Sequence, residues 1–405
     1  MVPLYQYWSK EVEVSHPNQD NQEARLAGIF ERCNSLRQSP MPDEGDLPEG
    51  FHGTLGHFPV YFPEEISHAA GLLPVNMLGG GNKLDMKHAD AHMGSFVCSI
   101  CRSTAELGLN GSLSGLSGFV THPICDAAKH LAGIWARNFP EQRAQILYLP
   151  QNPNSSGAVR FIAAEYQRLR AEFAQTTGHA IEDAALARSI RIYNRNRQLL
   201  REMYAIRRDA PWKLGCTESY LLLRARTRMP CEQHNEMLEA ALPAIRARNR
   251  AAQDKPRVVF VGGFCEQPPM EMLEAMDDTC YVVDDDLLIG LRWLTADVPE
   301  TGDPMWALAE SFVERSAASP VQHDERKTKE GYLMEMIETS RADAAIVTAA
   351  KFCEPGLDEQ VAWSKHLDQV GMPYLILEFE EKMTSFEQMA MQLETFAESL
   401  LFATA

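Results

Sequence analysis

The stretch LSGFVTHPICDAAKHLAGIW, residues 116–135, contains the pattern that decides the fold. A short apolar run leads into a loop with a proline, and the loop ends at Cys125, just before helical sequence with Asp126 in its first turn. A short apolar run followed by a helix start is typical of one strand–helix unit of a parallel α/β sheet. A cysteine at the junction would lie at the end of the strand.

The same unit recurs on both sides of this stretch. Upstream, FPVYFPEEISHAAGLLPVNMLGGG (58–81) passes from an apolar run through Pro63-Glu64-Glu65 into a helix and then to three glycines. Downstream, strand-like runs alternate with helical sequence: RVVFVGGF (257–264), CYVVDDDL (280–287), ADAAIVTAAKFCEP (342–355) and PYLILEFE (373–380). Strands that alternate with helices predict parallel sheets with connecting helices.

The rest of the chain has helical periodicity. Residues 1–50 contain helical sequence that ends in a Pro- and acid-rich linker, and residues 161–255 are helical almost throughout. The predicted fold class is therefore α/β, with two parallel-sheet domains of the flavodoxin- or Rossmann-like kind, a helical middle region and a helical N-terminus. The first α/β domain is predicted over 51–160 and the second over 256–405.

Composition limits the function classes. The chain has 405 residues, a formal net charge of −18 and a pI near 5.1, so a nucleic-acid surface is not expected, because phosphate backbones need clustered Lys and Arg. The N-terminus has no signal-peptide pattern, and no later segment reaches the ~18 apolar residues of a membrane span. A soluble, cytoplasmic protein is expected. Its anionic ligands would need local basic residues.

Nine cysteines are spread over the chain, an odd number that does not suit a secreted disulfide framework. Cys98 and Cys101 have C-x-x-C spacing, which is compatible with zinc, an iron-sulfur cluster or a redox disulfide, but no second pair follows. Cys98 is predicted to begin a helix, and Cys125 and Cys353 each lie at the end of a strand. In open α/β sheets ligands bind beyond the carboxyl ends of strands, so these three thiols can converge on a shared metal site. Nine reduced core thiols are the alternative.

Other motifs are weaker. GGFCEQ after a strand, with Asp284-Asp285-Asp286 further on, superficially resembles a dinucleotide fingerprint but lacks G-x-G-x-x-G; a tight turn and a solvated or capping acidic run explain it. Gly79-Gly80-Gly81 lacks the G-K-[ST] of a P-loop. Four histidines near the cysteines can donate protons, and His122 is the first to test; the four are His88, His92, His122 and His130.

Five stretches carry a family resemblance: VCSICRSTAELGL, HPICDAAKHLAGIW, FVGGFCEQPPMEML, CYVVDDDLLIG and AAKFCEPGLDEQ. In this order and spacing they resemble the subunits of ATP-dependent benzoyl-CoA reductase, within the wider 2-hydroxyacyl-CoA dehydratase family, from about residue 50 to the C-terminus. FCEQPP and RSTAELGL resemble the smaller, gamma-type subunits more than the beta-type ones. The resemblance implies a 4Fe-4S cluster on Cys98, Cys125 and Cys353, with Cys101 outside the ligand set. Cys265, in the turn after the strand RVVFVGG, is either an alternative fourth ligand or a structural thiol in a Gly-rich turn.

The resemblance also implies an activity and partners. Benzoyl-CoA reductase transfers two electrons to the aromatic ring of its acyl-CoA substrate and gives a cyclic dienoyl-CoA, with electrons from reduced ferredoxin and coupled ATP hydrolysis. Arg102 and Lys129 can offset the charge of a cluster or of CoA phosphates. The expected partners are a homologous beta-type subunit and ATP-hydrolysing activator subunits, so that ATP binds on a partner.

Two rival functions stay open beside the reductase. One is a 2-hydroxyacyl-CoA dehydratase subunit, which has the same fold and cluster but eliminates water through a radical. The other is a non-catalytic, cluster-carrying scaffold that only positions its partner or relays electrons. Neither the fold nor the three cysteines separates these readings, because one fold can carry several activities.

Overall fold

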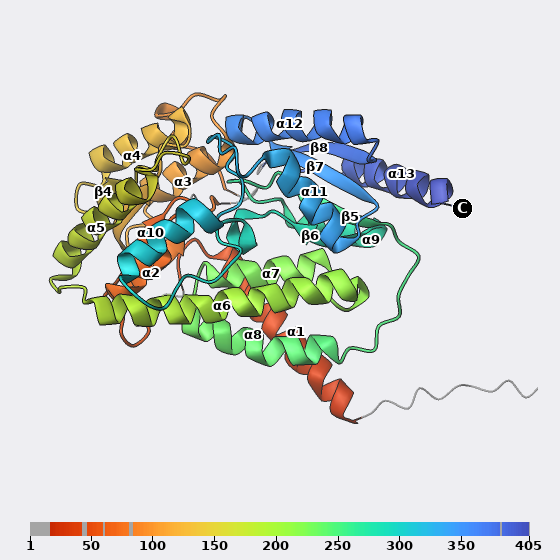
Figure 1. The fold of residues 1–405 in the computed structure, drawn as a ribbon, viewed down its shortest axis with the longest axis horizontal. Helices are drawn as coiled ribbons and strands as arrows, with labels where there is room; N and C mark the ends of the chain where they lie inside the picture. Colours follow the sequence, from red (N-terminus) through yellow and green to blue (C-terminus); the bar gives the residue numbers. More distant parts are fainter. Residues whose placement is uncertain (1–16, 43–46, 60, 81–83, 381–382, 405) are drawn as a thin grey trace, which may run out of the picture.

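In a computed structural model, the chain folds around two four-stranded sheets, all of whose strands are parallel (Figure 1). The structure describes residues 17–42, 47–59, 61–80, 84–380 and 383–404. The first sheet has the order β2-β1-β3-β4 and the second the order β6-β5-β7-β8. The two sheets therefore share one strand order, and the predicted α/β class with two parallel sheets is confirmed.

The first sheet and its helices come from residues 53–177. The strands are β1 (Gly53–His57), β2 (Leu72–Asn76), β3 (Leu116–Thr121) and β4 (Arg143–Ile146). The helices are α2 (Glu64–Ala69), α3 (Ser99–Leu109), α4 (Asp126–Asn138) and α5 (Ala158–Thr177), with a short 3-10 turn η1 (Ala89–Ala91) before α3. The stretch 116–135 forms β3, a loop and α4, as its pattern predicts.

The second sheet is formed by β5 (Arg257–Val261), β6 (Tyr281–Asp285), β7 (Ala344–Ala350) and β8 (Tyr374–Phe379). Its helices are α9 (Met270–Thr279), α11 (Lys329–Ser340), α12 (Glu354–Val370) and α13 (Glu387–Thr404). The glycine pair after β5 makes a tight turn: Gly262 has φ +108, and a Cβ on it would lie 1.9 Å from the carbonyl oxygen of Thr348. Only glycine fits there without moving β7.

A helical layer lies beneath both sheets in the view of Figure 1. It consists of α1 (Pro17–Gln38), α6 (Asp183–Asp209), α7 (Cys216–Arg226) and α8 (Cys231–Arg246), with a 3-10 turn η2 (Pro211–Lys213) after α6. The segment η3 (Leu288–Arg292) and helix α10 (Pro304–Arg315) follow β6, and α10 packs against α5. Part of the sequence predicted for the second domain thus joins the first core. The predicted domain boundaries stay predictions.

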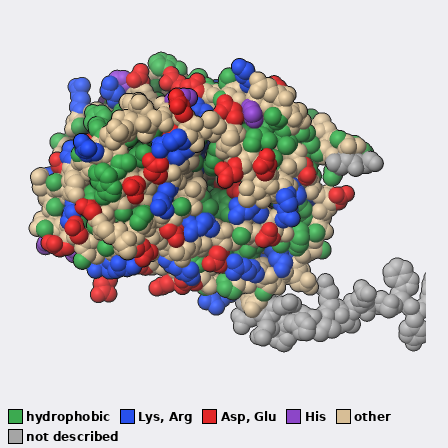
Figure 2. All heavy atoms as spheres, in the orientation of Figure 1, with side chains coloured by type: hydrophobic (Ala, Val, Ile, Leu, Met, Phe, Trp, Pro, Cys, Tyr) green, Lys and Arg blue, Asp and Glu red, His purple; other side chains and the backbone are tan. Residues whose placement is uncertain are grey.

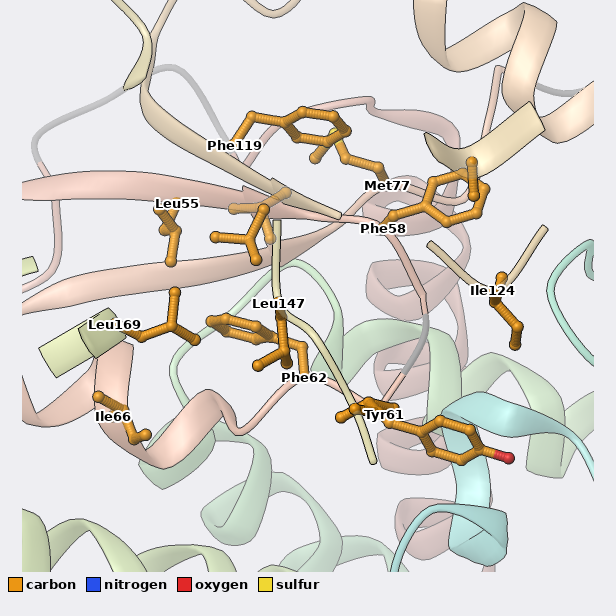
Figure 3. Packing of buried hydrophobic residues seen from close by; sticks show 14 of the residues in the cluster. Leu55, Phe58, Tyr61, Phe62, Ile66, Met77, Phe119, Ile124, Leu147 and Leu169 are labelled. Carbon is orange, nitrogen blue, oxygen red and sulfur yellow. The ribbon is translucent and has the colours of Figure 1, made fainter. Parts of the chain in front are cut away.

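Apolar side chains that follow β1, those of Phe58, Tyr61 and Phe62, belong to the core of the first sheet (Figure 3). Phe58, Tyr61 and Phe62 are each at most 3% exposed and pack with residues of the strands and of α5, such as Leu55 and Leu169. Burial of such side chains stabilises the fold by about 1.5–3 kcal/mol each. The side chains after β1 are therefore part of the core rather than of a solvated loop.

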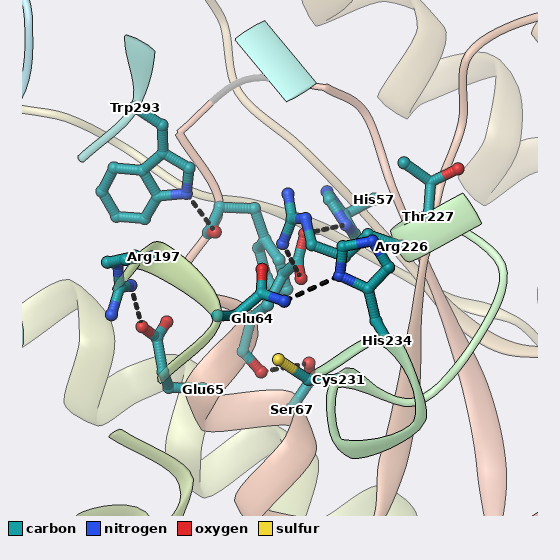
Figure 4. Close-up of polar contacts among 12 residues, drawn as sticks. His57, Glu64, Glu65, Ser67, Arg197, Arg226, Thr227, Cys231, His234 and Trp293 are labelled. Carbon is teal, nitrogen blue, oxygen red and sulfur yellow. Dashed lines mark hydrogen bonds and ion pairs between the residues drawn. The ribbon is translucent and has the colours of Figure 1, made fainter. Parts of the chain in front are cut away.

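Buried ion pairs fasten α2 to the helical layer (Figure 4). Glu64 lies 2.8 Å from Arg226 and 3.4 Å from His57, and Glu65 pairs with Arg197 of α6. Burial alone would raise the pKa of Glu64, but Arg226 and His57 bring it down to about 2. The two glutamates that mark a helix start in the sequence are therefore also inter-layer contacts.

Candidate functional site

Three of the predicted cysteines occupy equivalent places in the fold. Cys98 is the residue before α3, Cys125 the residue before α4, and Cys353 the residue before α12. Cys125 follows β3 and Cys353 follows β7, which are the corresponding strands of the two sheets. At Cys125 the start of the helix points toward the sulfur, because the Ala128 backbone nitrogen lies 3.5 Å from the Cys125 Sγ and donates to it. A helix N-terminus favours a thiolate.

One cavity of about 790 Å³ brings the three cysteines together. Cys101 from the first turn of α3 and Cys265 from the β5–α9 loop also line it. Most of the remaining wall is apolar, including Phe58, Met93, Phe96, Val97, Ile100, Ile124, Ile134 and Phe352. Segments that belong to both sheets therefore contribute to this wall, which combines five thiols with an apolar surface.

The electrostatics of the thiols show that they lie near one another. Burial raises the pKa of Cys353, and the neighbouring Cys98 raises it further. Burial also raises the pKa of Cys265, with further contributions from Cys353, Cys125 and Cys98. The pKa of Cys101 is raised, first by its hydrogen bond with Cys98. Without a cation these groups are neutral thiols, because several thiolates would repel one another in a buried site.

Thiols are the donors that hold iron-sulfur clusters, so the donor set around the cavity is compatible with such a group. Among the described residues no three His, Cys, Asp or Glu side chains are arranged to hold one metal ion. A single zinc ion needs every sulfur about 2.3 Å from the metal, so its ligands must nearly touch. A cubane cluster binds each thiolate to a different iron, so its ligands lie further apart around a larger group. Cys98, Cys125 and Cys353, which precede three separate helices around one cavity, are the residues that would hold such a cluster.

The predicted histidines divide into two groups. His92 and His130 line the cavity and are exposed. His122 is buried and lies outside the residues that line the cavity; its Nδ1 is 2.8 Å from the carbonyl oxygen of Leu147, and burial lowers its pKa to about 4. His88 pairs with Glu106 at 2.8 Å. The structure thus brings two of the four histidines to the thiols, and His122 is not one of them.

The remaining predicted groups lie as follows. Arg102 bonds to Asp90, and Lys129 is exposed on α4. The acidic run 284–286 is buried rather than solvated, contrary to the sequence-based expectation, and each carboxylate pairs with an arginine: Arg208, Arg207 and Arg292 in that order. The carboxylate that would bind a ribose in a dinucleotide site is therefore already occupied.

Sequence reasoning missed the residues that position the Cys353 helix. Arg292 has a wholly buried side chain; its Nη1 donates to Asp286 at 2.7 Å, and its Nη2 donates to Glu359 of α12. Asp286 in turn accepts from the Gly262 N–H at 2.9 Å, at the start of the loop that carries Cys265. An arginine six residues after an acidic residue gives no recognisable motif, so no sequence signal marks this cluster.

Exposed apolar side chains lie at and near the cavity. Phe96 is 74% exposed and Phe352 is 43% exposed, and Leu357 and Val361 follow on α12 at 37% and 68%. On the face drawn in Figure 2, by contrast, acidic and basic side chains are interspersed, without a broad basic patch. Within the described residues, every helix is too short or too polar to cross a bilayer.

Fold and cavity together define a two-sheet α/β protein whose site is built from convergent thiols. Residues 59–400 match the family described as 2-hydroxyglutaryl-CoA dehydratase, D-component, and the chain belongs to this family. It is 36% identical over 379 residues to a subunit of the benzoyl-CoA reductase of Thauera aromatica, covering 92% of this chain and 98% of that protein.

Two dehydratase subunits are also similar. The lactoyl-CoA dehydratase beta subunit of Anaerotignum propionicum is 29% identical over 380 residues, covering 93% of this chain and 100% of the relative. The (R)-2-hydroxyglutaryl-CoA dehydratase beta subunit of Acidaminococcus fermentans is 27% identical over 384 residues, covering 93% and 100%. The family resemblance seen in the sequence is confirmed over nearly the whole chain.

Proposed function

We propose that this chain is the iron-sulfur subunit of an ATP- and ferredoxin-dependent benzoyl-CoA reductase, which reduces the aromatic ring to a cyclohexadienoyl-CoA. The observation that carries the proposal is the convergence of Cys98, Cys125 and Cys353, from three helix N-termini, on one apolar cavity. The 36% identity to a benzoyl-CoA reductase subunit supports the substrate class. The three thiolates hold a 4Fe-4S cluster, and Cys265 is the candidate for a fourth ligand.

Each part of the cavity has a role in this proposal. When bound, such a cluster supplies single electrons at low potential. The apolar wall accepts an aromatic acyl group and excludes water, which strengthens the electrostatic interactions inside. His92 and His130 line the cavity and are placed to deliver protons to the reduced ring, whereas His122, predicted from the sequence, lies outside the wall and is neutral above its low pKa.

The proposed partners are a homologous beta-type subunit, ATP-hydrolysing activator subunits and, through them, ferredoxin. The relatives named above are themselves called subunits, which supports a hetero-oligomer. The exposed apolar side chains at and near the cavity, from Phe96 to Val361, support a partner that covers its mouth. ATP binds on the activator, and the assembly works in the cytoplasm.

The experiment is iron and sulfide counting with EPR on anaerobically purified protein. The wild-type chain should hold about four irons, and Cys98→Ser, Cys125→Ser and Cys353→Ser should each lose or degrade the cluster, because oxygen is a poor substitute for a thiolate on this iron site. The matched control is Cys280→Ser, whose thiol is buried but lies outside the cavity. Stoichiometric zinc, or full iron in all three variants, would overturn the proposal.

The second candidate is a 2-hydroxyacyl-CoA dehydratase subunit, which the similarity to two dehydratase beta subunits favours. The lower identities, 29% and 27% against 36%, place it second. Dienoyl-CoA formation from benzoyl-CoA supports the reductase, and enoyl-CoA formation from a 2-hydroxyacyl-CoA supports the dehydratase. A scaffold subunit would only position its partner or relay electrons, so substrate bound at this chain's own thiol cavity would argue against that role.

A further inference from the structure

A second cavity, of about 430 Å³, lies at the other end of α3 from the thiols. Its wall comes from the end of α1, the segment after β2, the end of α3, α7 and the β5–α9 loop with the start of α9. Volumes of this size are typical of small-molecule sites. None of the five cysteines and neither histidine of the thiol cavity lines it.

Three arginines gather at this cavity. Arg37 and Arg224 line it, and Arg228 is anchored beside it by donating to the carbonyl oxygens of Ser39 at 2.9 Å and Asn76 at 2.7 Å. None of the three forms a salt bridge with a carboxylate in the part of the chain that the structure describes. Wholly buried arginines elsewhere do form such pairs, as Arg207 does with Asp285.

Arg224 is the clearest anomaly. The residue is only 8% exposed, and its Nε and Nη1 atoms have no hydrogen-bond partner among the described residues. A buried guanidinium without acceptors is costly, because desolvation of a charged donor is not compensated. Arg37 and Arg228 carry the same charge as Arg224 and lie near it. Burial and the charge of Arg224 lower the pKa of Arg37, and they lower the pKa of Arg228 to about 9.

The other groups on the wall suit an anion with an organic body. The uncharged polar residues on the wall are Gln38, Ser39, Ser112, Tyr220 and Gln267, and Gly79 and Gly80 line it as well. The first turn of α9 also borders the cavity, but it carries the carboxylate of Glu271. Pro40, Leu107 and Pro268 supply apolar contact surface. Two carboxylates, Glu266 and Glu271, also line the cavity. Because they repel negative charge, an anion is expected on the part of the wall that Arg37 and Arg224 form.

We propose that this cavity binds a phosphate-bearing small molecule, with Arg224 and Arg37 as the phosphate ligands. Guanidinium groups form charge-assisted hydrogen bonds with phosphate oxygens, and an organic phosphate offers the acceptors that the Nε and Nη1 donors of Arg224 lack. The shared chemistry is an organic phosphate, carried either by a CoA thioester or by an adenine nucleotide. In the first case the inference rests on the proposed function, and in the second it does not.

The experiment is calorimetric titration of the full chain, purified anaerobically with any partner that copurifies, at low salt. The probes are CoA, dephospho-CoA, ADP and inorganic phosphate. Arg224→Gln and Arg37→Gln should each weaken binding about ten- to a hundredfold, because a charge-assisted hydrogen bond is lost. The matched control is Arg246→Gln, which removes the same charge from a half-exposed salt bridge elsewhere and should bind as the wild type does.

The probes distinguish the two sources. Tight CoA binding that weakens when the 3′-phosphate is absent identifies a CoA ester, and equal binding of ADP and CoA identifies the diphosphate. A second readout separates binding from support of the fold: without ligand, Arg224→Gln should not lower the thermal midpoint, because it relieves an unpaired buried charge, whereas a structural role would lower it.

Absence of binding by all four probes, or equal affinity in the wild type and both arginine variants, overturns the inference. Iron content is measured on the same samples. Normal iron with no phosphate binding refutes this site alone, and phosphate binding without iron refutes the cluster proposal alone.

Discussion

Substitution of Arg292 by methionine should destabilise the second sheet and the helix that begins after Cys353. The Arg292 side chain is wholly buried, as are those of its two carboxylate partners, Asp286 and Glu359. The substitution removes two hydrogen bonds between charged groups, worth about 1.5–3 kcal/mol each, and leaves two buried carboxylates without this counter-charge. Breaking a buried ion pair from one side typically costs about 3–5 kcal/mol. We therefore expect the free energy of unfolding to fall by about 4 kcal/mol.

The assay is urea denaturation followed by tryptophan fluorescence. Trp293 adjoins the substituted residue, and Trp363 is buried on α12, so the signal reports on this region. The control is Arg250→Met, which breaks a pair with Glu218 at a half-exposed side chain and should cost no more than about 1 kcal/mol.

A triple variant tests the cause. Adding Asp286→Asn and Glu359→Gln to Arg292→Met removes the uncompensated charges, and the asparagine oxygen can still accept from the Gly262 N–H. Most of the lost stability should return, because a neutral buried cluster avoids the desolvation of two carboxylates. A loss below about 1 kcal/mol in the single variant, or no recovery in the triple variant, would refute the reasoning.

Three further predictions concern the site, the pH dependence and the assembly. Cys101→Ser should keep the iron that Cys98→Ser loses, since Cys101 lies one helical turn further along α3; the reverse result in iron content and EPR would shift the ligand assignment by one turn. The pKa of Glu64 is about 2 in the folded protein and 4.5 in the unfolded chain, so its carboxylate stabilises the fold fully only above pH about 4.5. The difference in unfolding free energy between the wild type and Glu64→Gln should therefore shrink by about 3 kcal/mol as the pH falls toward 2. A difference that stays constant over this pH range in urea titrations would contradict the prediction. Val361→Asp should weaken association with the proposed beta-type partner about tenfold or more in sedimentation experiments, since it places a charge among the exposed apolar side chains of α12. Undiminished association would remove that face from the proposed interface.

The sequence by itself determined the fold class and the places of the cysteines along it. Runs of apolar and β-branched residues that alternate with helical sequence specify parallel strands, because both faces of such strands are buried. Helical sequence at Cys98 and Cys125 then places these two thiols at helix N-termini, and the apolar run before Cys353 places the third at a strand end. These features depend on neighbouring residues, and local sequence is enough to predict them.

Only the tertiary structure decided which of these groups meet. Cys125 and Cys353 are 228 residues apart in the chain (353 − 125), and they line one cavity because loops of the two sheets meet through packing that no local pattern encodes. The same holds for His122, which the sequence places near Cys125 but whose ring bonds to the carbonyl oxygen of Leu147. The unpaired donors of Arg224 are likewise invisible in the sequence, because whether an arginine has a partner depends on which distant acceptors the fold brings within reach, and among the described residues it brings none to Nε or Nη1.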